Sequence, residues 1–283
     1  HFEMKKILVF ALLIPFFACA QPKTPQDVVN LIKKNVTCKW ATETVDVFKA
    51  GNPDTPLKGI AVCMFADMET LREAVRQNCN FIIAHEPVFY SHFDETNSLT
   101  GDPVYEEKAK YIKENNLVIF RFHDHIHMTE PDGISEGMIR KLGLKPYSVK
   151  GSDTFFKLPE KTVAEYCSGL KKTLHLESIR IVGNPELKFT QLAFMAGAPG
   201  GQRHIQMMKN KDVEVILAGE ANEWETYLYA NDATALGKNK AVIFLGHIKS
   251  EEAGMEYCAE WLQTFIKGVP IRFIENKPNY KTL

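Results

Sequence analysis

Short apolar runs alternate with longer amphipathic stretches along most of the chain. The short runs predict strands, whereas stretches with apolar side chains three or four positions apart predict helices. The predicted strands cover residues 60–65, 81–84, 117–122, 179–182, 192–196, 213–217, 241–245 and 271–274. The predicted helices cover residues 26–36, 68–78, 104–114, 134–142, 204–208, 223–236 and 250–265. This alternation indicates an α/β protein in which helices flank mostly parallel sheets.

Helical periodicity stops between residues 145 and 157, where Gly151-Ser152-Asp153 interrupts the pattern. We therefore expect two similar α/β halves, residues 21–150 and 151–283. Because a mature chain of about 260 residues is still near the size of one hydrophobic core, we expect the halves to pack into one unit.

Residues 1–20 have the pattern of a secretory signal. Lys5 and Lys6 precede an apolar run at 7–17, and Ala18-Cys19-Ala20 supplies a cleavage site. Residues 1–3 lie ahead of the start-like Met4 and are interpreted as an upstream remnant. The run is shorter than the ~20 residues that a membrane-spanning helix needs, so we expect a periplasmic or extracellular protein without a transmembrane helix. Cys19 also fits a bacterial lipobox, which leaves simple cleavage and lipidation open.

Composition and charge narrow the classes of function. The chain is 45% hydrophobic and 24% charged, which excludes a disordered composition. Its formal net charge is -1, with 34 basic and 35 acidic residues interspersed, so the sequence gives no indication of nucleic-acid binding. The five cysteines beyond the signal form no CxxC pair, which argues against a disulfide framework or a cysteine-rich zinc site.

Histidines and carboxylates follow three predicted strands directly. His85-Glu86 comes after the strand at 81–84, His123 to His127 after the strand at 117–122, and His247 after the strand at 241–245. In α/β proteins ligands bind at these carboxyl ends of strands. If strand geometry persists beyond Phe122, then His123, His125 and His127 share one face. Glu251 follows His247 by one helical turn, so the two can clamp one metal ion.

These donors are imidazole nitrogens and carboxylate oxygens without thiolates, which suits Zn, Mn, Fe or Ni. They exceed one tetrahedral shell, so we expect two divalent metal ions and hydrolysis of a small-molecule substrate by metal-activated water. The expected metal ligands are His85, Glu86, His127, His247 and Glu251. Glu220, after the strand at 213–217, and His123 are expected to handle protons. Two alternatives stay open: Glu220 as a helix-cap carboxylate, and a metal-binding or scavenging protein without turnover.

The order of these motifs resembles the GTP cyclohydrolase I type 2-like family, also called the Nif-three-like dinuclear-metal proteins. The motifs are Ile82 to Pro87, the His123 and His127 pair, Gly219-Glu220, Gly246 to Glu251, and the segment Val269 to Asn279. The resemblance implies two similar halves with the metals between them, often assembled as a ring-shaped homo-hexamer.

The sequence departs from the family pattern at two positions. The usual His-His-Pro is His85-Glu86-Pro87, and the usual Asp four residues after the second His is His127. One histidine is lost and one is gained, so the donor count is preserved and we expect a re-ligated site. Because an exported protein does not meet cytoplasmic GTP, a phosphoester, nucleotide or amide is the expected substrate, and the family label alone does not decide activity.

Overall fold

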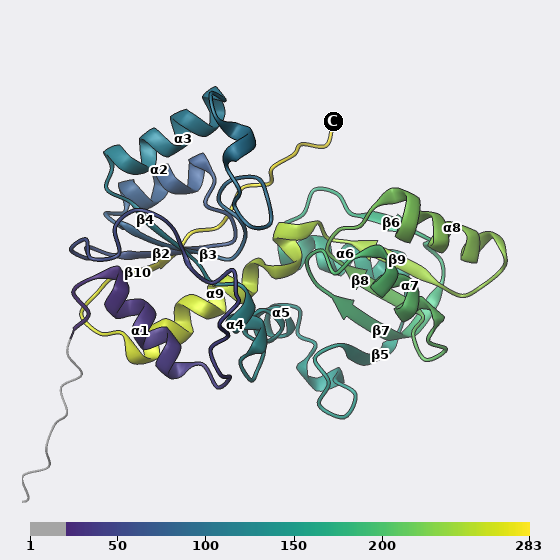
Figure 1. Cartoon of the computed structure of the whole chain (residues 1–283). Coiled ribbons are helices and arrows are strands. Elements are labelled where there is room, and N and C mark those ends of the chain that lie inside the picture. The colour runs from purple at the N-terminus through teal and green to yellow at the C-terminus, as the bar shows by residue number, and fades with distance from the viewer. Residues whose placement is uncertain (1–20) are drawn as a thin grey trace, which may run out of the picture.

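The computed structural model describes residues 21–283, which form two lobes, each built on a five-stranded sheet (Figure 1). The predicted signal segment and Cys19 lie outside the described residues. The first sheet has the strand order β1-β4-β3-β2-β10, in which only the β1–β4 pair is antiparallel. The elements before the second sheet are α1 (Pro25–Asn35), β1 (Phe48–Ala50), β2 (Ile60–Cys63), α2 (Met68–Arg76), β3 (Phe81–Ala84), the 3₁₀ turn η1 (Asn97–Leu99), α3 (Pro103–Glu114), β4 (Val118–Arg121), α4 (Asp124–Met128), α5 (Gly133–Lys141) and η2 (Lys145–Tyr147).

The central strands of the first sheet are apolar on both faces because helices cover both. In β2, Ile60 and Val62 pack with α1 and α9 (His247–Phe265), whereas Ala61 and Cys63 pack with α2 and α3. Successive side chains of a strand point to opposite faces, so one short run contributes to two cores. All four side chains of β2 are fully buried.

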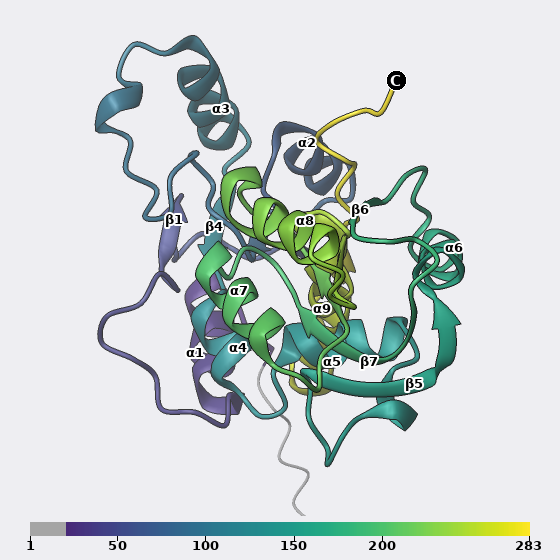
Figure 2. The ribbon, with the colours of Figure 1, turned by 90° about the vertical axis from the view of Figure 1, so that its right-hand side faces the viewer.

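The second sheet has the order β5-β7-β8-β9-β6, with parallel β7, β8 and β9 in the centre and antiparallel strands at both edges. Helices α5 and α6 cover one face, and α7 and α8 cover the other. Figure 2 views the molecule from the side of this lobe. The elements are β5 (Phe155–Thr162), α6 (Val163–Leu174), β6 (Arg180–Val182), β7 (Lys188–Met195), α7 (Gly201–Lys209), β8 (Val215–Ala218), the π-helical turn η3 (Glu223–Tyr227), α8 (Leu228–Ala235) and β9 (Ala241–Phe244).

Helix α9 connects the lobes. It begins directly after β9 and runs back under the first sheet, where β10 (Ile271–Phe273) pairs with β2 (Figure 1). Along the way it crosses α5 so closely that a Cβ on Gly137 would lie 2.2 Å from the Ala253 carbonyl oxygen. The division expected near residue 150 thus separates the strands of the two sheets except for β10, which returns to the first.

The predicted α/β class, with two sheets flanked by helices, is confirmed. Two local expectations were wrong. Residues 124–128 form helix α4 and do not extend the preceding strand, and the expected connector overlaps β5 and is followed by the unpredicted helix α6.

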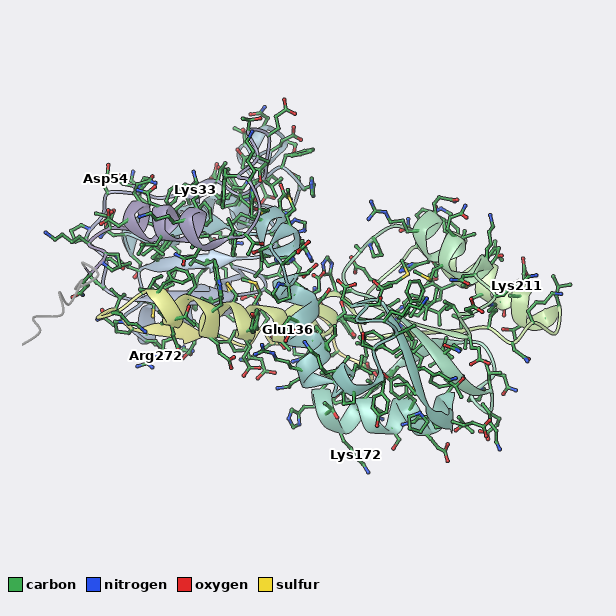
Figure 3. The ribbon with its side chains drawn as sticks, turned by 90° about the horizontal axis from the view of Figure 1, so that it is seen from below. Lys33, Asp54, Glu136, Lys172, Lys211 and Arg272 are labelled. Atoms are coloured by element: carbon green, nitrogen blue, oxygen red, sulfur yellow. The ribbon has the colours of Figure 1, made fainter. Side chains whose placement is uncertain are left out.

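The outer surface carries charges of both signs on both lobes. In Figure 3 the exposed Lys33 and Arg272 lie on the first lobe and Lys172 and Lys211 on the second, while Glu136 lies near the junction. Within residues 21–283, every helix is too short or too polar to span a bilayer.

Candidate metal centre

Three strand ends, two from the first sheet and one from the second, bring the candidate side chains together. β3 is followed by His85 and Glu86, β4 by the segment that enters α4, and β9 by the start of α9. His85, His123 and His127 each offer a nitrogen within 4.8 Å of the others, and His85, Glu86 and Glu251 form a second such group. The site therefore lies between the lobes and contains donors enough for a metal ion.

His85 and Glu251 face each other in an arrangement that calls for a cation. The Nδ1 of His85 lies 3.2 Å from the Phe122 carbonyl oxygen, which can only accept, so Nδ1 carries the hydrogen and Nε2 has a lone pair. That Nε2 lies 3.7 Å from Oε2 of Glu251. Both atoms are buried. Nε2 of His85 has no hydrogen-bond partner in the described part of the chain, and Oε2 of Glu251 has only an ion-pair contact with Nε2 of His247, 3.2 Å away. Two buried acceptors repel each other, and a metal ion is a group that both could bind.

His123 and His127 are held by carboxylates in the same manner. Nδ1 of His123 lies 3.0 Å from Oδ1 of Asp124, and Nδ1 of His127 lies 2.9 Å from Oδ2 of Asp132. A carboxylate that accepts a hydrogen bond from Nδ1 fixes the tautomer, so that Nε2 keeps a lone pair with which it can bind a metal ion. The His123 ring also stacks on His85, with ring centroids 4.6 Å apart. The three rings thus present Nε2 atoms to one region.

His247 connects the carboxylates. Its Nδ1 lies 3.1 Å from Oε1 of Glu220, and its Nε2 lies 3.0 Å from Oε1 of Glu86 and 3.2 Å from Oε2 of Glu251. Burial alone would lower the pKa of His247, but hydrogen bonds with Glu220, Glu251 and Glu86 raise it to about 12. Without a metal, the imidazolium is the cation that these three carboxylates share.

The same charges shift the pKa values of the neighbouring groups. Burial raises the pKa of Glu86, but the hydrogen bond from His247 and the charges of the nearby histidines bring it down to about 2. Burial and the charges of His127 and His123 hold the pKa of His85 well below its usual value. Arg121, fully buried, adds a positive charge with Nη2 3.5 Å from Oε2 of Glu86. At neutral pH Glu86 is therefore ionised and His85 is neutral, which are the protonation states that bind metals, whereas His247 would release its proton on binding one.

Comparison with known proteins gives the family. A family model described as Duf34/NIF3 (NGG1p interacting factor 3) matches residues 24–280. The chain belongs to the Duf34/NIF3 family. The resemblance predicted from the motifs is thereby confirmed, and its match covers nearly the whole described chain.

Individual relatives of this Duf34/NIF3 protein agree with that membership. A Clostridium acetobutylicum protein named GTP cyclohydrolase 1 type 2 homolog is 25% identical over 239 residues, which cover 80% of this chain and 84% of the relative. The crystal structure of a Bacillus cereus protein related to NIF3 has a TM-score of 0.73 at 14% identity and covers 93% of this chain and 100% of its own. A hypothetical protein of Staphylococcus aureus has a TM-score of 0.72 at 16% identity and covers 93% and 100%. These structures establish the shared fold.

All seven candidate residues predicted from the sequence lie in one connected group. Glu220 contacts His247, His247 contacts Glu86 and Glu251, and Glu251 faces His85. The rings of His123 and His127 lie beside His85.

The expectation that His125 shares a face with His123 and His127 was wrong. Because residues 124–128 form a helix, side chains two positions apart point in different directions. His125 is fully buried and stacks on Trp40 with ring centroids 3.6 Å apart. Its Nδ1 lies 2.7 Å from Asp46, and its Nε2 accepts a hydrogen bond from the backbone amide of Ala41. His125 therefore has a structural role in this family member.

Three carboxylates that orient the site residues were not predicted from the sequence. Asp132 and Asp124 hold His127 and His123, and Asp46 accepts hydrogen bonds from the backbone amides of residues 123, 124 and 125. Asp132 could have been found, because it is also the N-cap of the predicted helix at 134–142. Asp46 precedes its partners by 77 to 79 residues, and no local pattern connects them.

Proposed function

We propose that this chain is a metal-dependent hydrolase of a small-molecule substrate, with two divalent ions, Zn, Mn, Fe or Ni, between its lobes. The observation that carries the proposal is the pair of buried acceptors, Nε2 of His85 and Oε2 of Glu251, which face each other at 3.7 Å with no hydrogen bond between them. A buried acceptor without a hydrogen bond costs ~1–3 kcal/mol, and a bound cation would remove that cost for Nε2 of His85.

We assign the ligands by the atoms that converge. Nε2 of His123 and His127 would bind one ion, and Nε2 of His247 with the carboxylates of Glu86 and Glu251 would bind the other. His85 belongs to both groups of donors and has only Nε2 to offer, so it completes one of them. Glu86 and Glu251 would supply the oxygen ligands of the second group.

Bound ions would supply Lewis acidity and lower the pKa of a water molecule. The protein's own contribution at that point is Glu220. Its hydrogen bond with His247 lowers the pKa of Glu220, so the side chain is a carboxylate at neutral pH and accepts protons. Its Oε1 orients His247, and the side chain is half exposed, so water can reach it. With His123 assigned as a ligand, Glu220 is the group we propose to receive a proton from water.

The test compares two variants of the purified, metal-loaded protein. Glu251→Ala removes a ligand, and metal content measured by mass spectrometry should fall. Glu220→Gln keeps the shape and the metal, yet turnover in a screen of phosphoesters, nucleotides and amides should fall by about 100-fold or more, the usual contribution of a general base. Glu256→Ala, on the outer side of the same helix as Glu251, is the matched control and should change neither.

Turnover separates this proposal from a metal-binding protein without catalysis. Fully metallated protein that hydrolyses none of the three substrate classes would favour the metal-binding or scavenging alternative. Unchanged metal content in Glu251→Ala would rule out both. Export with residues 1–20 as a signal, lipidation at Cys19 and assembly as a homo-hexamer remain predictions, which the mature N-terminus and the mass of the assembly in solution would test.

A further inference from the structure

A cavity of about 870 Å³ opens beside the metal centre. Glu220 and His247 line it, and the rest of its wall is formed by residues 175–178, Arg180, residues 245–249 and residues 277–283. Its volume lies within the range of small-molecule sites. Because the cavity shares Glu220 and His247 with the proposed centre, a molecule bound in it would reach the reacting groups.

The segment 277–283 closes one side of this cavity by spanning the two lobes. At its start, Nζ of Lys277 lies 2.8 Å from Glu69 on α2 of the first lobe. Near its end, the hydroxyl of Thr282 lies 3.0 Å from that of Ser178, which precedes β6 of the second lobe. Between these contacts Tyr280 passes over Gly246, where an added Cβ would lie 3.3 Å from the tyrosine oxygen. Figure 1 shows this segment between the lobes.

Charged side chains of both signs line the cavity wall. Four cationic side chains line it against two carboxylates, Glu177 and Glu220. Two of the cations are already neutralised, because Lys249 pairs with Glu252 and Glu275, and Lys277 with Glu69. The other two are available. Arg180 has a single long contact of 3.9 Å with Glu223, and Lys281 has no carboxylate within 4.0 Å in the described part of the chain.

We propose that this cavity is the substrate site of the hydrolase and that it selects a small phosphate-bearing compound, with Arg180 and Lys281 binding the anion. This inference rests on the proposed function. Arg180 offers a planar pair of N–H donors that match phosphate oxygens, and Lys281 adds a mobile positive charge. Tyr280, which lines the cavity, provides aromatic surface for the body of the compound. The guanidinium of Arg180 lies 5.7 Å from the ring of Tyr227, which supports it from behind.

Calorimetric titration of the metal-loaded protein with phenylphosphonate, a non-hydrolysable probe, tests the assignment. Arg180→Gln and Lys281→Gln should each weaken binding, the first by about tenfold, because a charge-assisted hydrogen bond is lost. Lys211→Gln, a change of the same type on the exposed surface of the second lobe, should bind as the wild type does. All three variants should keep their metal content. Benzyl alcohol, a neutral compound of similar size, should show no dependence on Arg180.

Two results would overturn the assignment. One is the absence of phenylphosphonate binding, and the other is unchanged affinity in both cavity variants, which would mean that the metal ions alone hold the anion. Because the titration needs no turnover, the outcome is distinct from that of the hydrolase test. Protein that binds phenylphosphonate through Arg180 but hydrolyses no substrate would refute the proposed function and leave the anion site standing.

Discussion

The facing acceptors of His85 and Glu251 predict how the stability of the protein depends on metal. A bound ion present at 100 times its Kd stabilises the folded state by about 2.7 kcal/mol. For a chain of this size, 1 kcal/mol shifts the melting midpoint by about 2–4 °C, so one ion should raise it by about 5–10 °C. This gain is comparable to the ~1–3 kcal/mol that an unpartnered buried acceptor such as Nε2 of His85 costs in the metal-free protein.

Glu251→Gln should change the melting temperature in opposite directions in the metal-free and the metal-loaded protein, relative to the wild type. The amide keeps the shape of the side chain and can donate to Nε2 of His85. It can still accept from His247, whose ion pair with Glu251 is lost but whose charge Glu86 and Glu220 continue to neutralise. We therefore expect the metal-free variant to melt at or above the midpoint of the metal-free wild type. On adding metal, the wild type should gain its 5–10 °C and the variant should gain much less.

Calorimetric scans of chelator-treated and reloaded protein measure both effects. Glu256→Gln, on the same helix but half exposed, should behave as the wild type in both states. The reasoning is refuted if wild-type protein melts at the same temperature with and without metal, or if Glu251→Gln retains the full shift.

Three further predictions follow from the structure. Asp132→Asn should keep the N-cap of α5 but lose the acceptor for His127, so metal affinity should fall by about 10–100-fold. The control Asp102→Asn, at the N-cap of α3, should leave metal affinity unchanged. Competition with a chelating dye measures the affinity of both variants. Burial lowers the pKa of Lys108 from 10.5 to about 8 in the folded protein despite the nearby Asp67 and Asp94, so the unfolded chain binds more protons between those values. The unfolding free energy of the wild type relative to Lys108→Met should therefore rise from about pH 8 to about pH 10 in urea denaturation, and a flat or falling difference would contradict the burial argument. Phe156→Ala should lower the unfolding free energy by ~3–5 kcal/mol in the same assay, because this side chain is fully buried in the second lobe. Phe93 is 65% exposed, so Phe93→Ala should change the unfolding free energy by about 0.5 kcal/mol or less. Equal effects of the two substitutions would contradict the assignment of Phe156 to the core.

The grouping of the candidate site residues was predictable to the extent that local patterns determine it. A donor directly after a buried parallel strand has a defined place at the sheet edge, which is how His85 and Glu86 could be assigned to one site. The four-residue spacing of His247 and Glu251 likewise predicted that both side chains lie on the same side of a helix, and that helix begins at His247. The apolar runs identified the central strands for the same reason, because burial on both faces leaves little room for polar residues.

Contacts between distant residues account for part of what the sequence did not indicate. The turn into α4 depends on the carboxylate of Asp46, so the histidines of residues 123–127 were expected on one face when they lie on a helix. Other omissions had a local signal. Thr162 and Glu165 form a capping box at the start of α6, and the alternation of buried Phe156 and Leu158 in β5 is typical of an edge strand, even with Pro159 beside it.

Anomalous diffraction from crystals of the metal-loaded protein tests the central claim most directly. We expect two ions between the lobes, one at Nε2 of His123 and His127 and the other at His247, Glu86 and Glu251, with Nε2 of His85 bound to one of them. Crystals that show no ion at these atoms under saturating metal, or ions bound only elsewhere on the surface, would contradict the account.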